Sequence, residues 1–146
     1  MSHAAFDEFF PDIASKETRV VTLTGPNPKG HEPGPNAFIE YYCTDPTCDC
    51  RNVYIQIINE NFPGPLATIS YGWESKAYYK KWMGAADDDE LLSDFIGPSL
   101  AIGSRQSPYA EHWLRVFKDI IQKDKVYVSR LQRHYQLMKS HVSNQK

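Results

Sequence analysis

The stretch AFIEYYCTDPTCDCRNVYIQIIN (residues 37–59) joins two strand-like segments through a cysteine-rich turn. The first segment alternates between two faces, with Phe38, Glu40 and Tyr42 on one and Ile39, Tyr41 and Cys43 on the other. The second segment places β-branched side chains on one face: Val53, Ile55 and Ile57. Asp45-Pro46 favours a turn between them, because Asp suits the first turn position and Pro the second. The stretch therefore predicts an antiparallel hairpin.

Further strands and helices are expected on either side of this hairpin. RVVTLT (19–24) and LATISYG (66–72) have the β-branched character of strands, and NFPGP (61–65) is a turn between strands. A short helix is expected around Phe6 to Phe10, ended by Pro11. Short connections between the strands predict an antiparallel sheet.

The second half of the chain is expected to be helical. Ser75 can cap a helix over 75–83, and DELLSDF (89–95) favours a short one. Ser107-Pro108 favours the start of a helix that reaches about Lys123. Asp124 can cap a last helix, whose apolar stripe has helical spacing: Val128, Leu131, Tyr135, Met138 and Val142.

These elements predict an α+β fold. A small antiparallel β-sheet of three or four strands would have the C-terminal helices packed on one face, with a zinc-knuckle-like hairpin. The 146 residues favour a single domain, 1–146, with frayed termini at about 1–5 and 140–146.

The composition indicates a cytoplasmic protein. No apolar run approaches the roughly 20 residues that span a bilayer, and the acidic start MSHAAFDEFFPDIASKE does not resemble a signal peptide. A reducing compartment and an odd number of cysteines, three, argue against a structural disulfide.

All the cysteines of the chain, Cys43, Cys48 and Cys50, fall within eight positions. The hairpin would fold Cys43 back toward the other two, and Cys48 and Cys50 point to the same side of an extended chain. Three converging thiolates suit tetrahedral zinc, with Zn–S distances of about 2.3 Å. The sequence therefore predicts zinc, although thiolate sites also accept iron.

Three other interpretations of the cysteines remain open. A Cys48–Cys50 disulfide would close a strained ring, and a Cys43–Cys48 disulfide would leave one free thiol. A reactive thiolate would need a neighbouring cation, which Arg51 could supply. The thiols could also be inert.

Three cysteines leave a fourth ligand position, for which five histidines compete. His3 lies in a terminus expected to fray, His31 in a Pro- and Gly-rich loop, and His112 beside the apolar side of its helix. His134 flanks the stripe of the last helix, with His141 one heptad later. We predict His134 as the fourth ligand, in which case the zinc ion would join the hairpin to this helix. His31 or water are the alternatives, and a hydrogen-bonded histidine at the edge of the core is the simpler role for His134.

A closed site of this kind is structural, whereas an open position is typical of catalytic zinc. A catalytic site also needs a general base, and the nearby carboxylates are Glu40, Asp45, Asp49 and Glu74. The sequence lacks H-E-x-x-H and the H-x-E and P-C-x-x-C pair of zinc deaminases. We therefore expect a binding or interaction module with structural zinc. A protein without enzymatic activity is expected more than an enzyme. A zinc-dependent hydrolase with an open position is one alternative.

A second alternative is nucleic-acid binding through the basic last helix. Residues 115–146 carry eight Lys/Arg and two Asp/Glu, whereas residues 1–114 have a net charge of −8. Binding would require Arg130, Arg133 and Lys139 to be exposed together. Because basic residues alternate with core-type apolar ones, packing against an acidic body is the preferred interpretation, and nucleic acid is not the expected partner.

Four segments resemble an uncharacterised bacterial family: FIEYYCTDPTCDCRNV, ATISYGWESKAYYKKWM, GPSLAIGSRQSPYAEHWL and YVSRLQRHYQLMK, within about residues 36–139. Its members share a C-x-D-P-x-C-D-C-R core and an R-x-x-RHY helix. The resemblance implies a bacterial source, a zinc-type role for the three cysteines, and importance for Arg133, His134 and Tyr135. Some relatives carry a C-terminal SEC-C zinc motif, which is absent here, so its docking role does not transfer. The resemblance implies no activity.

Overall fold

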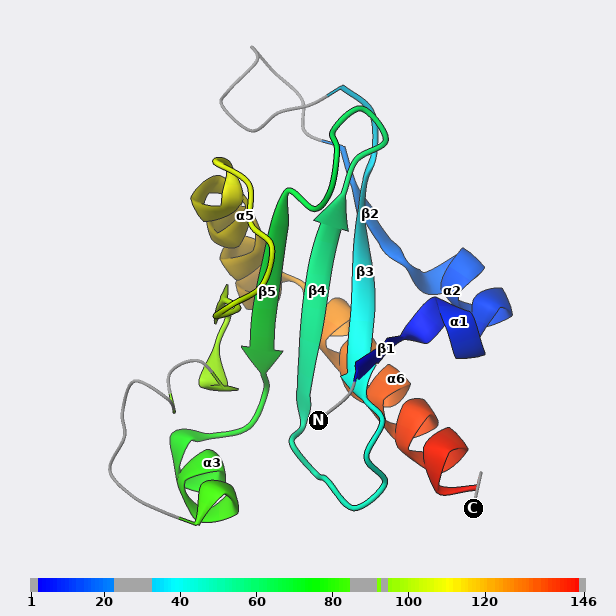
Figure 1. Ribbon diagram of the computed structural model, residues 1–146, viewed down its shortest axis with the longest axis vertical. Helices are drawn as coiled ribbons and strands as arrows, with labels where there is room; N and C mark the ends of the chain where they lie inside the picture. The colour runs from blue at the N-terminus through cyan, green and yellow to red at the C-terminus, as the bar shows by residue number, and fades with distance from the viewer. Residues whose placement is uncertain (1–2, 23–32, 85–91, 93–94, 145–146) are drawn as a thin grey trace.

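Figure 1 shows the computed structural model, which describes residues 3–22, 33–84, 92 and 95–144. The elements in chain order are β1 (His3–Ala5), α1 (Phe6–Phe9), α2 (Pro11–Glu17), β2 (Arg19–Val21), β3 (Asn36–Cys43), β4 (Asn52–Ile58), β5 (Ala67–Gly72), α3 (Lys76–Met83), β6 (Ser99–Leu100), α5 (Ala110–Lys123) and α6 (Lys125–Ser143). His31 and most of the helix expected over 89–95 lie outside the described residues.

The strands form an antiparallel sheet in the order β1-β3-β4-β5-β6, with β2 also paired to β3. The hairpin β3–β4 forms as predicted, with Phe38 opposite Ile57 and Tyr41 opposite Tyr54. The described residues contain six strands, so the prediction of three or four was wrong in size. The additional strands, β1 and β6, have three and two residues, too few for a periodic sequence pattern.

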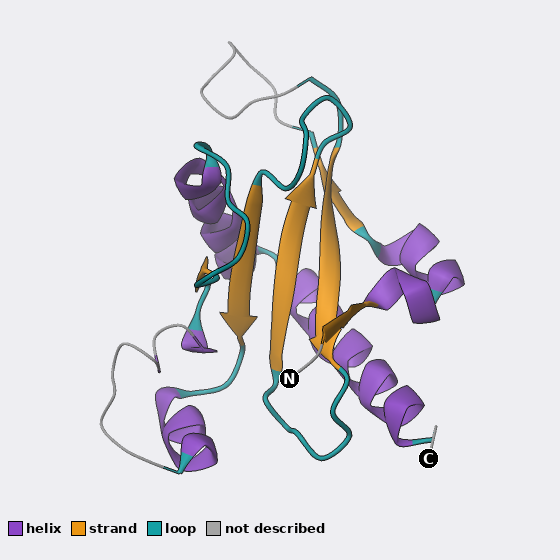
Figure 2. Ribbon diagram, viewed as in Figure 1, coloured by secondary structure: helices purple, strands orange, loops and turns teal. Residues whose placement is uncertain are grey.

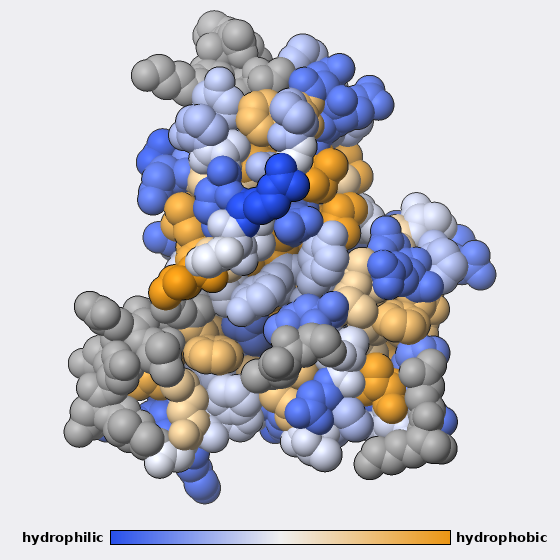
Figure 3. All heavy atoms as spheres, in the orientation of Figure 1, coloured by the Kyte–Doolittle hydropathy of each residue, from blue (hydrophilic) through white to orange (hydrophobic). Residues whose placement is uncertain are grey.

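Helices α5 and α6 pack on one face of this sheet (Figure 2), as the sequence predicts. The core-facing residues of β4 are Val53, Ile55 and Ile57, all fully buried. They meet the stripe of α6, in which Leu131, Tyr135 and Met138 are buried. Burying a side chain of this size stabilises the fold by roughly 1.5–3 kcal/mol. Figure 3 shows the opposite face, where hydrophilic residues are interspersed with hydrophobic ones.

Two predicted helix caps are confirmed. The Ser75 side chain accepts a hydrogen bond from the Tyr78 N–H (3.1 Å), and Asp124 accepts one from the Tyr127 N–H (3.0 Å). Each satisfies a backbone donor that the first turn leaves unpaired. No helix among the described residues is both long enough and apolar enough to cross a membrane.

The N-terminal segment is more ordered than the sequence predicts. Residues 3–5 form β1, paired with the end of β3. Pro11 ends α1, as expected, but it also begins α2, where its fixed φ angle suits the first helical position. The chain then returns as β2, which pairs with the start of β3. As a result α1 and α2 lie beside the outer edge of β3 (Figure 1).

Candidate metal centre

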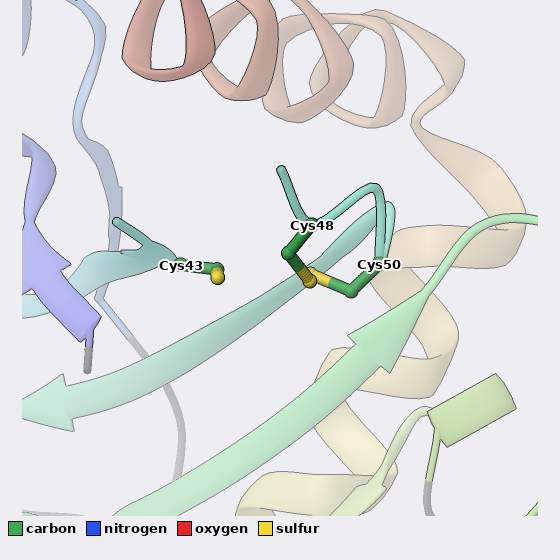
Figure 4. A group of neighbouring side chains, drawn as sticks. All are labelled: Cys43, Cys48 and Cys50. Atoms are coloured by element: carbon green, nitrogen blue, oxygen red, sulfur yellow. The ribbon is translucent and has the colours of Figure 1, made fainter. Parts of the chain in front are cut away.

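The three cysteines come together at one end of the hairpin. Cys43 is the last residue of β3, and Cys48 and Cys50 belong to the connection to β4, residues 44–51, which we call the cysteine loop. The three sulfur atoms all lie within 4.8 Å of one another. Figure 4 shows Cys48 and Cys50 side by side, with Cys43 facing them. Cys43 and Cys50 are buried, Cys48 is half-buried, and none of the three forms a disulfide. The group could hold a metal ion.

The first half of the cysteine loop is the turn that Asp45-Pro46 predicts. The Asp45 carboxylate accepts hydrogen bonds from the Thr47 N–H (2.9 Å) and hydroxyl (2.7 Å). The Cys48 N–H donates to the Asp45 carbonyl (3.1 Å), which closes the turn and directs Cys48 back toward Cys43. The Asp45 N–H lies 3.4 Å from Cys43 Sγ, so a backbone donor faces the sulfur.

The second half of the loop is held through Arg51, whose φ of 45° lies in the left-handed region. A non-glycine residue there costs of order 1 kcal/mol, so surrounding contacts must hold it. The Arg51 N–H donates to the hydroxyl of Tyr135 (3.2 Å), which in turn donates to Asp49 (2.8 Å). The guanidinium forms ion pairs with Asp49 (2.9 Å) and Glu74 (2.7 Å) and lies over the ring of Tyr78 (4.5 Å). The loop is thereby fixed to α6 and to the start of α3.

The sequence analysis did not predict this network. Arg51 was expected to act, if at all, as a cation near a reactive thiol, whereas its guanidinium is directed at two carboxylates. The hydrogen bond from Arg51 is the main cause that holds the pKa of Asp49 below its usual range. The signal was present in the spacing: Asp49 and Arg51 flank Cys50, so in extended chain their side chains share one side.

The electrostatic setting of the thiols does not favour a reactive cysteine. Burial raises the pKa of Cys50 to about 12 and also raises that of Cys48, and the neighbouring thiol of Cys43 adds to both shifts. A reactive cysteine requires the opposite, a pKa lowered by nearby positive charge. A bound cation would reverse the effect, because a coordinating thiol loses its proton.

The structure places His134 away from this cluster. His134 is fully buried, and its ring stacks on Phe6 with centroids 4.0 Å apart. Its Nδ1 lies 2.7 Å from Glu40 Oε1, and its Nε2 lies 2.7 Å from Glu17 Oε1. Both ring nitrogens are therefore engaged by carboxylates, and the group of ligand atoms contains the cysteines without His134.

Strand alternation gives the physical reason for this placement. Glu40 lies on the face of β3 that packs against α6, and Cys43 falls on the alternate face. A histidine that reaches Glu40 from α6 therefore approaches the opposite side of the strand from Cys43. The sequence carried a signal, because Glu40 shares its face with Phe38 and Tyr42, and a buried carboxylate requires a partner.

Glu17 links the buried histidine to the surface. Its carboxylate accepts hydrogen bonds from Arg133 (2.8 and 3.2 Å) as well as from the ring of His134. The bonds from Arg133 first, and then from His134, lower the pKa of Glu17 from 4.5 to about 2. Because the folded state binds this proton more weakly than the unfolded state, the stabilisation is complete above about pH 4.5 and is lost toward pH 2.

Replacing Glu17 by glutamine should therefore reduce the loss of stability between pH 5 and pH 3. At pH 7 the variant should be less stable by about 1 kcal/mol, since the ion pair with Arg133 is partly exposed. Urea unfolding at several pH values measures both effects. Asp119→Asn is a matched control, because Asp119 pairs with Lys123 on a solvated face of α5. If Glu17→Gln and the native chain show the same pH slope, Glu17 does not contribute in this way.

A polar groove lies beside the cysteine loop, with a volume of about 670 Å³. Its lining residues come from the loop, the segment after β5, and α6: Arg51, Trp73, Glu74, Ser129, Gln132, Arg133 and Gln136. Arg51 belongs both to the groove and to the cysteine loop. The conformation of the loop therefore decides where the guanidinium lies in the groove.

The basic residues of α6 are not all available on one surface. Arg133 is exposed, but Arg130 and Lys139 are half-buried. Arg130 donates to the Glu17 carbonyl (3.0 Å), and Lys139 donates to the Asp45 carbonyl (2.7 Å). The joint exposure that nucleic-acid binding requires is not present in this structure.

Comparison of the chain with protein-family models, with curated proteins and with solved structures finds no match. The resemblance drawn from the sequence motifs therefore stays an expectation.

Proposed function

We propose that the protein binds one zinc ion through Cys43, Cys48 and Cys50, and that the metal is structural. The observation that carries this proposal is the convergence of the three sulfur atoms within 4.8 Å. Tetrahedral zinc with Zn–S bonds of about 2.3 Å requires sulfur atoms about 3.8 Å apart. Small side-chain adjustments therefore suffice, and a thiolate set of this kind suits zinc among the abundant divalent cations.

The contacts of the cysteine loop support a structural role. Lys139 donates to the Asp45 carbonyl, and Tyr135 bonds both Asp49 and the Arg51 N–H, so α6 contacts both halves of the loop. A metal that joins the end of β3 to the second half of the cysteine loop would hold these contacts in place. We propose that the ordered loop and the adjoining groove form the surface of a binding or interaction module, with Arg51 as the residue that connects them.

A hydrolase is less well supported. A general base must lie within about 3 Å of the metal-bound water. The four nearby carboxylates already have partners: Asp45 with Thr47, Asp49 with Arg51 and Tyr135, Glu74 with Arg51, and Glu40 with Tyr42 and His134. Freeing any of them would break a contact that positions the loop or the core.

The first test is the metal content of the protein produced with zinc in the medium. We expect one zinc per chain for the native protein and for Thr47→Ser, a control that keeps the hydroxyl bonded to Asp45. Cys48→Ser should lower zinc affinity at least about tenfold, since even residues that only orient ligands contribute 10- to 100-fold. Elemental analysis and competition with a chromogenic chelator measure both quantities.

Native zinc affinity in Cys48→Ser would overturn the proposed site. To separate structural from catalytic metal, cobalt can replace zinc and exogenous ligands such as a hydroxamate can be added. A closed site should leave the visible spectrum of the cobalt protein unchanged. A spectral shift on addition would indicate an open position and favour the hydrolase.

A further inference from the structure

The strand β1 runs beside the β3–β4 hairpin that carries the cysteines, and the first residue of β1 is His3. β1 pairs with the end of β3 in antiparallel register, with His3 directly opposite Cys43. Opposite residues of an antiparallel pair project to the same face, with Cβ atoms about 4.5–5.5 Å apart. His3 therefore shares the face of Cys43, the face that His134 does not reach.

The imidazole ring of His3 lies over the end of β3. The ring stacks on Tyr54 of β4, with centroids 4.7 Å apart and planes inclined by 14°. Since β3 lies between β1 and β4 in the sheet, the ring must cross β3 to meet Tyr54. Tyr54 is paired with Tyr41, two residues before Cys43. The imidazole thus lies over the segment of β3 that leads into the cysteine cluster.

We propose that His3 is the fourth ligand of the metal held by Cys43, Cys48 and Cys50. This inference rests on the zinc site proposed above and completes it as a closed Cys3His site, the ligand set of structural zinc. His3 is not among the ligand atoms that lie within 4.8 Å of one another, so its side chain must turn from Tyr54 toward the sulfurs. His134 would instead have to leave two carboxylates, one of them the buried Glu40.

The consequence is a metal that joins three neighbouring parts of the structure. Cys43 belongs to β3 and Cys48 and Cys50 to the cysteine loop, while His3 would add β1. A strand of three residues has little stability of its own. Ligation would hold β1, and with it the start of α1, against the edge of β3.

The test measures zinc affinity and the coordination shell in four histidine variants. His3→Phe keeps an aromatic ring to stack on Tyr54 but removes the ligand, and it should lower zinc affinity at least about tenfold. X-ray absorption should show three sulfurs and one imidazole in the native protein, and the imidazole signal should vanish in His3→Phe. His3→Cys should retain the metal with four sulfurs. His134→Ala and the control His141→Ala should retain the imidazole signal.

Each contrary result has a distinct meaning. An imidazole signal that persists in His3→Phe but vanishes in His134→Ala would overturn the assignment in favour of His134. Three sulfurs and an oxygen in the native protein would replace His3 by water. Either result keeps the zinc site and removes only the inference about His3. If the native chain binds no zinc, or if Cys48→Ser binds it equally well, the zinc site itself fails and the inference fails with it.

Discussion

Replacing His134 by alanine is expected to lower the free energy of unfolding by about 3–5 kcal/mol, the usual cost of truncating a fully buried ring to alanine. The change also takes a hydrogen-bond partner from the buried Glu40. Glu40 is 5% exposed, and among the described residues it would keep the hydroxyl of Tyr42 as its side-chain partner. The stack on Phe6 would also be lost. Denaturant unfolding at pH 7 measures the change, and zinc content should remain that of the native chain.

The matched control is His141→Ala, on the same helix. His141 is half-buried and packs against the rings of Phe9 and Phe10, so its loss should cost about 1 kcal/mol. Combining His134→Ala with Glu40→Gln changes both partners of the same contact, so the double variant should lose less stability than the sum of the two single variants. Equal costs for His134→Ala and His141→Ala would show that the carboxylates do not depend on His134.

Removing the proposed zinc ion is expected to lower the stability of the protein by a similar amount. A ligand present at a thousandfold excess over its dissociation constant stabilises the folded state by about 4 kcal/mol. For a chain of this length, that corresponds to a fall in Tm of about 8–16 °C when a chelator strips the zinc. Scanning calorimetry with and without chelator, with metal removal verified by elemental analysis, measures it.

The control for this experiment is the triple variant Cys43→Ser, Cys48→Ser and Cys50→Ser. It lacks the proposed ligands, so the chelator should leave its Tm unchanged. If the native protein loses its zinc and keeps its Tm, the metal does not stabilise the fold, and a structural role for it would be wrong.

The hairpin and the helices could be predicted because their signals are local. The alternation of side chains over 37–43 and 52–59 decides which of them face α6. The register of the two strands agrees with this alternation, with Glu40 opposite Ile55. The caps Ser75 and Asp124 are single residues with a direct partner three positions later. Patterns of this kind need no knowledge of the rest of the chain.

The short strands at the sheet edges could not be predicted in the same way. β6 consists of Ser99 and Leu100, and it is a strand because Ile69 and Ser70 of β5 lie beside it. β1 likewise depends on the end of β3. A segment of two or three residues has no period of its own, so its structure is set by partners distant in sequence.

In the candidate site, too, the local contacts could be predicted from the sequence and the long-range contacts could not. The convergence of Cys43, Cys48 and Cys50 follows from a turn and a spacing within eight residues, and the structure brings the three together as expected. The partners of His134 are 94 and 117 positions away, and those of Arg51 include Tyr135, 84 positions away. Such contacts are decided by the packing of α6, which the sequence pattern does not specify.

The pairing of β3 on its outer edge restricts how a partner can bind. β2 pairs with residues 36–38 and β1 with residues 41–43, so only Ile39 and Glu40 are without a strand partner along that edge of the described sheet. On the other edge, β6 pairs with Ile69 and Ser70. The side-chain amide of Gln106 accepts a hydrogen bond from the Thr68 N–H and donates one to the Thr68 carbonyl. Recognition by strand addition needs a longer run of free backbone groups. The same closure protects the sheet from edge-to-edge aggregation, and a binding partner must therefore be recognised through side chains.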